Sequence, residues 1–229
     1  MPVAAIVISG CGHSDGAEIN ETVLTALALS ERGIAVRWFS PDGDQPAVMD
    51  HVTRTPEAGG PGRNMLREAA RIARGRIAPL TALRVADASC LVFPGGSGTA
   101  RNLFTFKLEG ARCRIDPAVE AALAAAVELR RPILAVGIAA ALPALFLARR
   151  GQRPTVTLGP QLDKIRQIEA AGARHEPSSV GACVVDETHR LITTPAFLHR
   201  DPEPELRDVM RGVRAAVERL HAWLSPVGA

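Results

Sequence analysis

The 17 uncharged residues from Pro132 to Ala148 constrain the fold more than any other segment. They lie between two arginine pairs, an arrangement that resembles a membrane span with basic flanks. A span needs about 20 apolar residues, whereas this segment is shorter, rich in alanine, and interrupted by Gly137 and Pro143. The pattern therefore predicts a short buried strand, a sharp turn and a buried helix, and we expect no membrane association.

Gly137 occupies the predicted turn. A strand-to-helix turn of this kind holds its central residue at positive φ and presents that residue's side chain at the mouth of an α/β sheet. Glycine adopts positive φ without steric strain and has no side chain that reacts. Position 137 therefore supplies no nucleophile.

Strand and helix patterns alternate along the rest of the chain. Apolar runs predict strands at 3–9, 34–40, 90–93, 155–158, 182–185 and 191–193. Helical spacing of apolar residues predicts helices at 17–32, 63–74, 117–130, 161–171 and 204–224. This alternation indicates an α/β fold with a mostly parallel sheet covered by helices on both faces. Because no linker or internal repeat interrupts it, we expect residues 1–229 to form one domain.

Ligands of such sheets bind at the carboxyl ends of the strands. We therefore expect segments 10–21, 94–102 and 137–141 to converge there. The Pro/Gly/Asp-rich excursion 42–62 is too long for an ordinary connection, and such loops are usually functional. In the second segment, Gly95 and Gly96 form either a simple tight turn or a turn that exposes backbone N–H groups as an oxyanion site.

The composition limits the kinds of molecule that the chain is expected to bind. A net charge of +3 and an aromatic content of 3% argue against nucleic-acid binding. The four cysteines include no CxxC pair, so we expect neither a disulfide framework nor a zinc site, and a reducing cytoplasm fits best. The six histidines lack metal-ligand spacing. We expect no metal and no cofactor.

The glycine-containing segment 9–16 has a competing interpretation as a dinucleotide phosphate loop, with Asp42 as the ribose acid. Its spacing departs from G-x-G-x-x-G, and Asp15 and Glu18 place negative charge where a pyrophosphate would lie. We therefore favour a loop that binds no nucleotide. Cys11 within it is either a small buried filler or a second thiol near the site.

Glu18 and Glu21 lie three residues apart near a helix start and share one helix face. In the simpler interpretation both are solvated acids that the helix N-terminus stabilises. Glu21, however, lies between the apolar Ile19 and Val23, so we expect it to point toward the end of the sheet. Burial there would raise its pKa into a useful acid/base range.

Motifs spread over nearly the whole chain carry a family resemblance. They are Ser9-Gly10-Cys11-Gly12, Asp15-Gly16-Ala17-Glu18-Ile19, Arg63-Asn64, Glu68-Ala69-Ala70-Arg71-Ile72-Ala73-Arg74-Gly75, Pro94-Gly95-Gly96, Ala100-Arg101-Asn102-Leu103 and Thr193-Thr194-Pro195-Ala196-Phe197. The chain thereby resembles the ElbB-type proteins of the ThiJ/PfpI superfamily, which have the class I glutamine amidotransferase-like fold. The resemblance implies a flavodoxin-like sandwich, a homodimer, and modest glyoxalase (lyase-like) activity on small 2-oxoaldehydes.

The resemblance also implies roles for individual residues. The family uses a cysteine at the strand-to-helix elbow, a glutamate that hydrogen-bonds its sulfur, and backbone N–H groups as an oxyanion hole. The glutamate matches Glu21, the oxyanion glycine matches Gly96, and the elbow cysteine matches Gly137, which Ile138 follows. At Gly137 we expect a vacancy about the size of the missing thiol. The residues expected to contact substrate are Cys11, His13, Asp15, Gly95, Asn102 and Thr194.

Three functions remain open from the sequence. In the first, Glu21 performs non-covalent acid/base chemistry on a small carbonyl metabolite while the N–H groups of Gly96 and Ile138 polarise the carbonyl. In the second, a catalytically silent protein binds a metabolite or a partner protein through the same pocket. The third keeps thiol chemistry but moves the nucleophile to Cys11. We favour the first.

Overall fold

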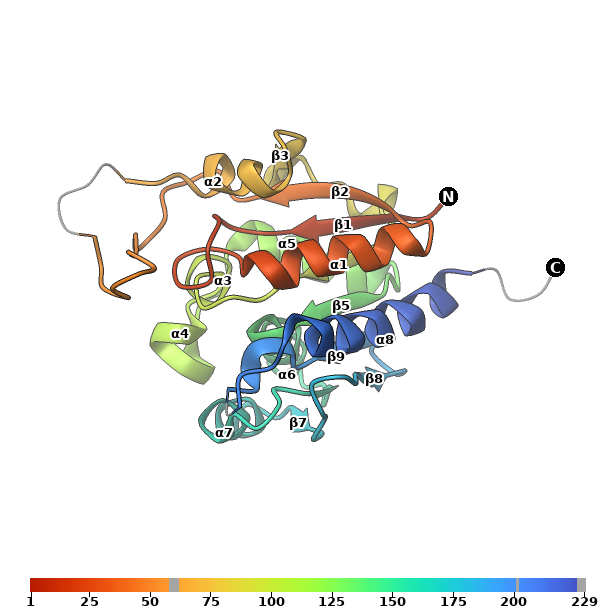
Figure 1. Ribbon diagram of the computed structural model, residues 1–229. Helices are drawn as coiled ribbons and strands as arrows, with labels where there is room; N and C mark the ends of the chain where they lie inside the picture. The colour runs from red at the N-terminus through yellow and green to blue at the C-terminus, as the bar shows by residue number, and fades with distance from the viewer. Residues whose placement is uncertain (58–61, 201, 226–229) are drawn as a thin grey trace.

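Seven strands form the central sheet of the computed structural model, which describes residues 1–57, 62–200 and 202–225 (Figure 1). In chain order these strands are β1 Val3–Val7, β2 Ala35–Ser40, β3 Ile77–Pro79, β4 Cys90–Phe93, β5 Ile133–Val136, β8 Val184–Asp186 and β9 Leu191–Thr194. Their order across the sheet is β3-β2-β1-β4-β5-β9-β8, and every neighbouring pair is parallel except β8 with β9. The predicted mostly parallel sheet is confirmed.

Successive side chains of the central strands enter two different cores, as the period-2 geometry of a strand requires. On β1, Ala4 and Ile6 belong to one core, whereas Ala5 and Val7 belong to the other. Because both faces are covered, these strands are apolar throughout rather than alternating with polar residues.

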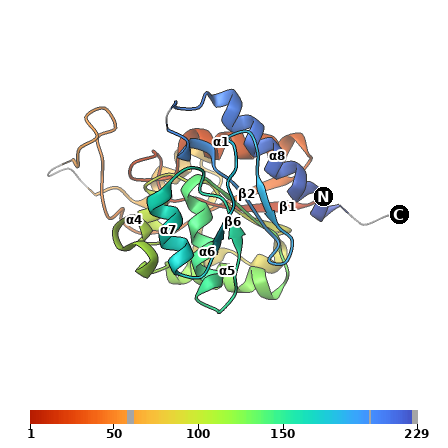
Figure 2. The same ribbon diagram turned by 90° about the horizontal axis from the view of Figure 1, so that it is seen from below.

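Helices cover both faces, as Figures 1 and 2 show from two directions. One core is closed by α1 Ile19–Glu31, α2 Met65–Ile72 and α8 Leu206–Leu224, and the other by α5 Pro117–Glu128, α6 Ala141–Ala148 and α7 Leu162–Ala170. The shorter helices are α3 Thr99–Asn102, α4 Phe106–Glu109 and the 3-10 turns Leu80–Ala82, Val85–Asp87, Gly110–Arg112, Gly137–Ala140 and Ala196–Leu198. This is the flavodoxin-like, class I glutamine amidotransferase-like arrangement.

The segment from Pro132 to Ala148 folds as predicted. It comprises β5, the 3-10 turn that begins at Gly137, and α6, and all its residues are buried. Within the described ranges, the chain has no helix that is both long and apolar enough to cross a membrane.

Some elements differ from the sequence-based prediction. The expected strand at 155–158 is only β6 Thr155–Val156, which pairs with β7 Arg174–His175 in a separate two-stranded sheet. The strands β3 and β7 were not predicted, because two or three residues are too few for a periodic pattern. Helix α1 begins at Ile19 rather than at Ala17, because the Glu18 side chain caps it by accepting the Glu21 N–H.

Candidate functional site

Three loops meet at the carboxyl edge of the sheet, as predicted. The Gly98 N–H donates to the His13 carbonyl (3.0 Å) and the Glu18 N–H donates to the Gly95 carbonyl (2.8 Å). The third loop lies against this pair, because a Cβ built on Gly95 would lie 3.2 Å from the Ile138 nitrogen. The loops approach so closely that glycine is required at Gly95, Gly96 and Gly98, where an added Cβ would lie within 3.0 Å of neighbouring atoms.

Glu21 lies in the first turn of α1 and is 3% exposed. Its carboxylate accepts the Gly95 N–H at 2.9 Å and lies 3.4 Å from the Phe197 nitrogen. The backbone of Glu21 is itself held by Glu18, whose carboxylate accepts the Glu21 N–H at 2.5 Å. Its neighbours Ile19 and Val23 are 43% and 48% exposed, so the burial of Glu21 was predicted from the wrong residues.

Burial raises the pKa of Glu21 to about 8, and the nearby negative charge of Glu18 acts in the same direction. The backbone N–H groups of Phe197 and Gly95 lower the pKa but only partly offset burial. The carboxyl group is therefore mostly protonated at neutral pH. It can donate a proton to a substrate and take one back.

Gly137 has a φ of +57°, as predicted for the centre of the turn. The expected vacancy beside it is wrong. A Cβ at this position would lie 2.7 Å and 2.9 Å from the two carboxylate oxygens of Glu21. The glutamate therefore fills the space that a side chain at 137 would need.

A cavity of about 170 Å³ opens in front of this carboxyl group. Its lining residues come from the first loop, α1, the Gly96 turn, α3, α4, the Gly137 turn, α7 and the segment after β9. They are His13, Glu18, Glu21, Gly96, Ser97, Ala100, Phe106, Lys107, Ile138, Asp163, Lys164, Gln167, Phe197, Leu198 and Arg200. Four predicted site residues, Glu21, Gly96, Ile138 and His13, thus share one cavity, and Gly95 and Gly137 support it from behind.

Gly96 lines the cavity. Gly96 has a φ of +114° and, among the residues that the structure describes, its N–H donates to no other group. His13 lies at the opening, and burial lowers the pKa of its imidazole, with the nearby His51 acting in the same direction. The cavity continues into a wider groove of about 1010 Å³ that shares six residues with it: His13, Glu18, Ser97, Lys107, Phe197 and Arg200.

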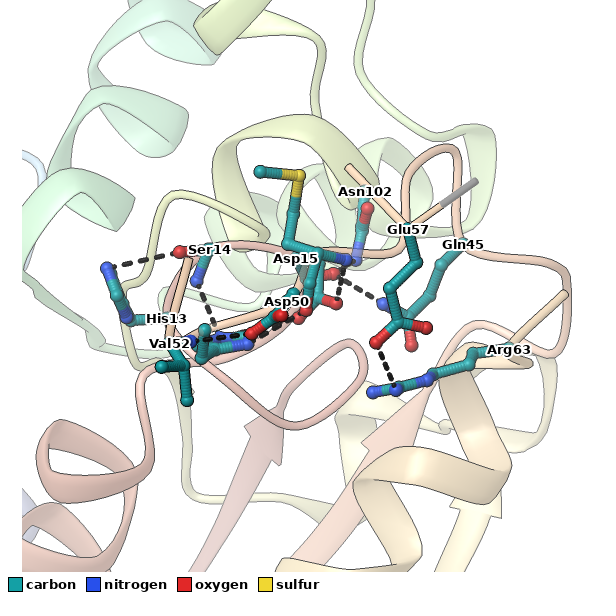
Figure 3. A network of polar contacts seen from close by, with 11 residues as sticks. His13, Ser14, Asp15, Gln45, Asp50, Val52, Glu57, Arg63 and Asn102 are labelled. Atoms are coloured by element: carbon teal, nitrogen blue, oxygen red, sulfur yellow. Dashed lines mark hydrogen bonds and ion pairs between the residues drawn. The ribbon is translucent and has the colours of Figure 1, made fainter. Parts of the chain in front are cut away.

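Two expected substrate contacts, Asp15 and Asn102, do not line the cavity and instead support the loops (Figure 3). The Asp15 carbonyl accepts the side-chain amides of Gln45 (2.8 Å) and Asn102 (2.9 Å). The Asp15 carboxylate accepts the Met49 N–H at 2.8 Å. Asp15 therefore ties the described part of the 42–62 excursion to the sheet edge, whereas residues 58–61 lie outside the described residues.

Thr194 and Cys11 also lie outside the cavity lining. The Thr194 hydroxyl donates to the Ala182 carbonyl at 2.9 Å, which positions the chain that leads into β8. Burial raises the pKa of the Cys11 thiol, and the negative charge of Glu68 adds to the shift. Cys11 therefore lacks both the position and the thiolate character that a relocated nucleophile needs.

The cavity also has charged lining side chains that the sequence does not predict, and they come from α4, α7 and residue 200. Lys107, Lys164, Asp163 and Arg200 belong to no recognisable motif. One signal was nevertheless present, since Lys107 and Lys164 are the only two lysines in the chain. In the described ranges, no group of three or more His, Cys, Asp or Glu residues is placed to hold a metal ion.

No protein-family model matches the chain. Curated relatives do match it over most of its length. It is 37% identical over 225 residues to the human glutamine amidotransferase-like class 1 domain-containing protein 3, mitochondrial, covering 94% of this chain and 81% of the relative. The rat ES1 protein homolog, mitochondrial, is 36% identical over 225 residues, covering 94% and 82%.

Solved structures have a similar fold. The crystal structure of an isoprenoid biosynthesis protein with an amidotransferase-like domain from Ehrlichia chaffeensis superposes with a TM-score of 0.89 and 30% identity, covering 98% of this chain and all of that one. DJ-1beta from Drosophila melanogaster, at a TM-score of 0.52 and 15% identity over 97% and 95% of the two chains, shares the fold.

The expected cytoplasmic location is contradicted, because both curated relatives are named mitochondrial. The physical reason for the error is that scattered, unpaired cysteines indicate only a reducing compartment. Composition does not distinguish one reducing compartment from another.

Proposed function

The chain belongs to the ES1 family of glutamine amidotransferase-like class 1 proteins, and we propose that it acts on a small carbonyl metabolite by acid/base chemistry at Glu21. The observation that carries the proposal is the buried, mostly protonated Glu21 carboxyl group at the end of an open cavity. A group that titrates near neutral pH and reaches a cavity suits proton transfer to and from a substrate.

The surroundings of Glu21 support a carbonyl substrate. The Gly96 N–H is directed to no protein partner among the described residues, and Gly96 and Ile138 both line the cavity. Backbone N–H groups at such positions stabilise the negative charge that develops on a carbonyl oxygen. The reaction uses no thiol, because position 137 has no side chain and Cys11 lies elsewhere. We propose a glyoxalase-like conversion, with 2-oxoaldehydes as the first substrates to examine.

The substitution Glu21→Gln tests this proposal. Glutamine is isosteric and its side-chain oxygen can still accept the Gly95 N–H, so the fold should be retained. Turnover of methylglyoxal should fall by about 10²-fold or more, the usual contribution of a positioned proton-transfer group. Glu120→Gln is the matched control, because Glu120 is an exposed acid that pairs with Arg150 away from the cavity.

An unchanged turnover in Glu21→Gln would remove Glu21 from the mechanism. If the wild-type protein converts no small carbonyl compound but such a compound raises its Tm, the silent binding protein is the better description, because a ligand that binds only the folded state stabilises it. Homodimerisation stays a prediction, for sedimentation measurements to check.

A further inference from the structure

The chain uses lysine in one place only. Of its 27 lysine and arginine residues, two are lysines, and both line the cavity beside Glu21. They come from different elements, Lys107 from α4 and Lys164 from α7. In the described ranges, three of the 27 lysine and arginine residues line the cavity, the third being Arg200, so a random placement of two lysines would seldom put both there.

Lysine and arginine differ in the chemistry that they supply. Arginine stays protonated and binds carboxylates and phosphates with a planar fork, so it serves better where only a positive charge is needed. Lysine can lose its proton, and the neutral amine is a nucleophile toward carbonyl carbon. A chain that uses arginine in its surface ion pairs, such as Arg214 with Glu31 and Arg63 with Glu57, has lysine where an amine would face a substrate.

Lys107 is the better placed of the two. It is exposed and lines both the cavity and the wider groove, so a substrate would pass it on the way to Glu21. The Lys164 side chain is 17% exposed, and its ammonium group forms an ion pair with Asp163 at 3.0 Å. Lys107 has no ion-pair partner within the described part of the chain.

The charges around Lys107 favour its neutral form. Burial lowers the pKa of the Lys107 amine, and the positive charges of Lys164, Arg200 and Arg101 lower it further, against a smaller opposite effect of Asp163. Crowding of cations around a partly desolvated lysine is a recognised way to produce a nucleophilic amine.

We propose that Lys107 is the covalent nucleophile of this cavity and forms an imine with the carbonyl carbon of a small aldehyde or ketone. The inference rests on the proposed function and adds a covalent step to it. The neutral amine attacks the carbonyl carbon, a C–N bond forms, and the carbonyl oxygen takes a proton from the neutral Glu21 carboxyl group. Glu21 then passes a second proton to this oxygen, which leaves as water, and the C=N bond of the imine forms. The two protons that the nitrogen loses return to Glu21 in turn, so Glu21 ends protonated.

This role accounts for the absence of a thiol. Gly137 carries no side chain, and the Glu21 carboxyl occupies the space where one would stand. Glu21 and Lys107 line the same cavity from different elements, so acid and nucleophile can act on opposite ends of one carbonyl group.

Borohydride trapping tests the proposal directly. The folded protein is incubated at pH 7 with hydroxyacetone or glycolaldehyde, reduced with sodium cyanoborohydride, and mapped by peptide mass spectrometry. The chain has only two lysines, so the reduced adduct can be assigned to Lys107, to Lys164 or to the amine of Met1. We expect it on Lys107, at least tenfold above the other two amines. No adduct on Lys107, or equal labelling of the three amines, would overturn the proposal.

Two matched variants separate an amine from a mere positive charge. Lys107→Arg keeps the charge but cannot form an imine, so it should lose both the adduct and most of the turnover. Lys164→Arg should keep the adduct on Lys107. Full turnover in Lys107→Arg would show that the residue only binds an anion. If Glu21→Gln is inactive and the wild-type protein forms no adduct, Glu21 acts as the acid but Lys107 forms no imine. If the adduct forms and Glu21→Gln is fully active, Lys107 forms the imine but Glu21 is not the acid.

Discussion

Replacing Gly137 by alanine should displace the Glu21 carboxyl group. The new Cβ would lie 2.7 Å and 2.9 Å from the two carboxylate oxygens, closer than nonbonded atoms tolerate. Glu21 cannot retreat without breaking its hydrogen bond from the Gly95 N–H, which is 2.9 Å long and buried. The substitution therefore tests directly whether glycine at 137 exists to accommodate the glutamate.

Two effects set the size of the destabilisation. A non-glycine residue at a φ of +57° costs about 1–2 kcal/mol. Forcing extra atoms into a packed site costs about 1–3 kcal/mol more. We therefore expect Gly137→Ala to lower the free energy of unfolding by about 2–5 kcal/mol. Urea denaturation followed by circular dichroism would measure this.

A control and a double mutant isolate the clash. Gly33 has a φ of +67° and, in the part of the chain that the structure describes, no atom within 4 Å of an added Cβ, so Gly33→Ala should show only the backbone effect. In a Glu21→Ala background the clash disappears, and Gly137→Ala should cost about 1–2 kcal/mol there as well. The coupling energy between positions 21 and 137 should thus be about 1–3 kcal/mol.

Two results would refute this reasoning. One is additivity of the two substitutions within error. The other is an equal destabilisation by Gly137→Ala and Gly33→Ala, and this comparison holds even if Glu21→Ala fails to fold.

Two further predictions concern protons and thiols. The pKa of Glu21 rises from 4.5 to about 8 on folding, so between these pH values the folded state holds a proton that the unfolded state has lost. The free energy of unfolding should therefore fall as pH rises, by at most about 1.4 kcal/mol per pH unit. Glu21→Gln should lack this slope in urea denaturation at a series of pH values, and an equal slope in both proteins would argue against a raised pKa. Because no cysteine among the described residues lines the cavity, alkylation with iodoacetamide should leave turnover largely intact, whereas inactivation in step with modification of Cys11 would restore the thiol mechanism.

The sequence predicts the burial of Glu21 for a reason that the structure does not support. Its apolar neighbours Ile19 and Val23 are half exposed, because residues two apart on a helix point in nearly opposite directions. The burial of Glu21 instead follows from the helix start at Ile19, which Glu18 sets by capping, and from the Gly95 turn that packs against it. The first contact is local, between residues three apart, whereas the second joins residues 74 apart in the chain.

Asp15 and Asn102 illustrate the opposite error. Both lie in predicted site loops, and both support the loops instead of lining the cavity. A polar side chain in a tight turn can either hydrogen-bond to the backbone or contact a ligand. The neighbouring residues in the sequence do not show which of these it does.

What the sequence by itself determined is the framework: apolar runs of strand length, helical periodicity and the glycine at 137 specify the parallel sheet, its covering helices and the turn at positive φ, because these depend on local period and sterics. Only the tertiary structure decided that Glu21 fills the space beside Gly137 and that Lys107 and Lys164 meet in one cavity. The physical reason is that those contacts join segments far apart in the chain. A local sequence pattern does not show which distant side chains pack next to it in the folded protein.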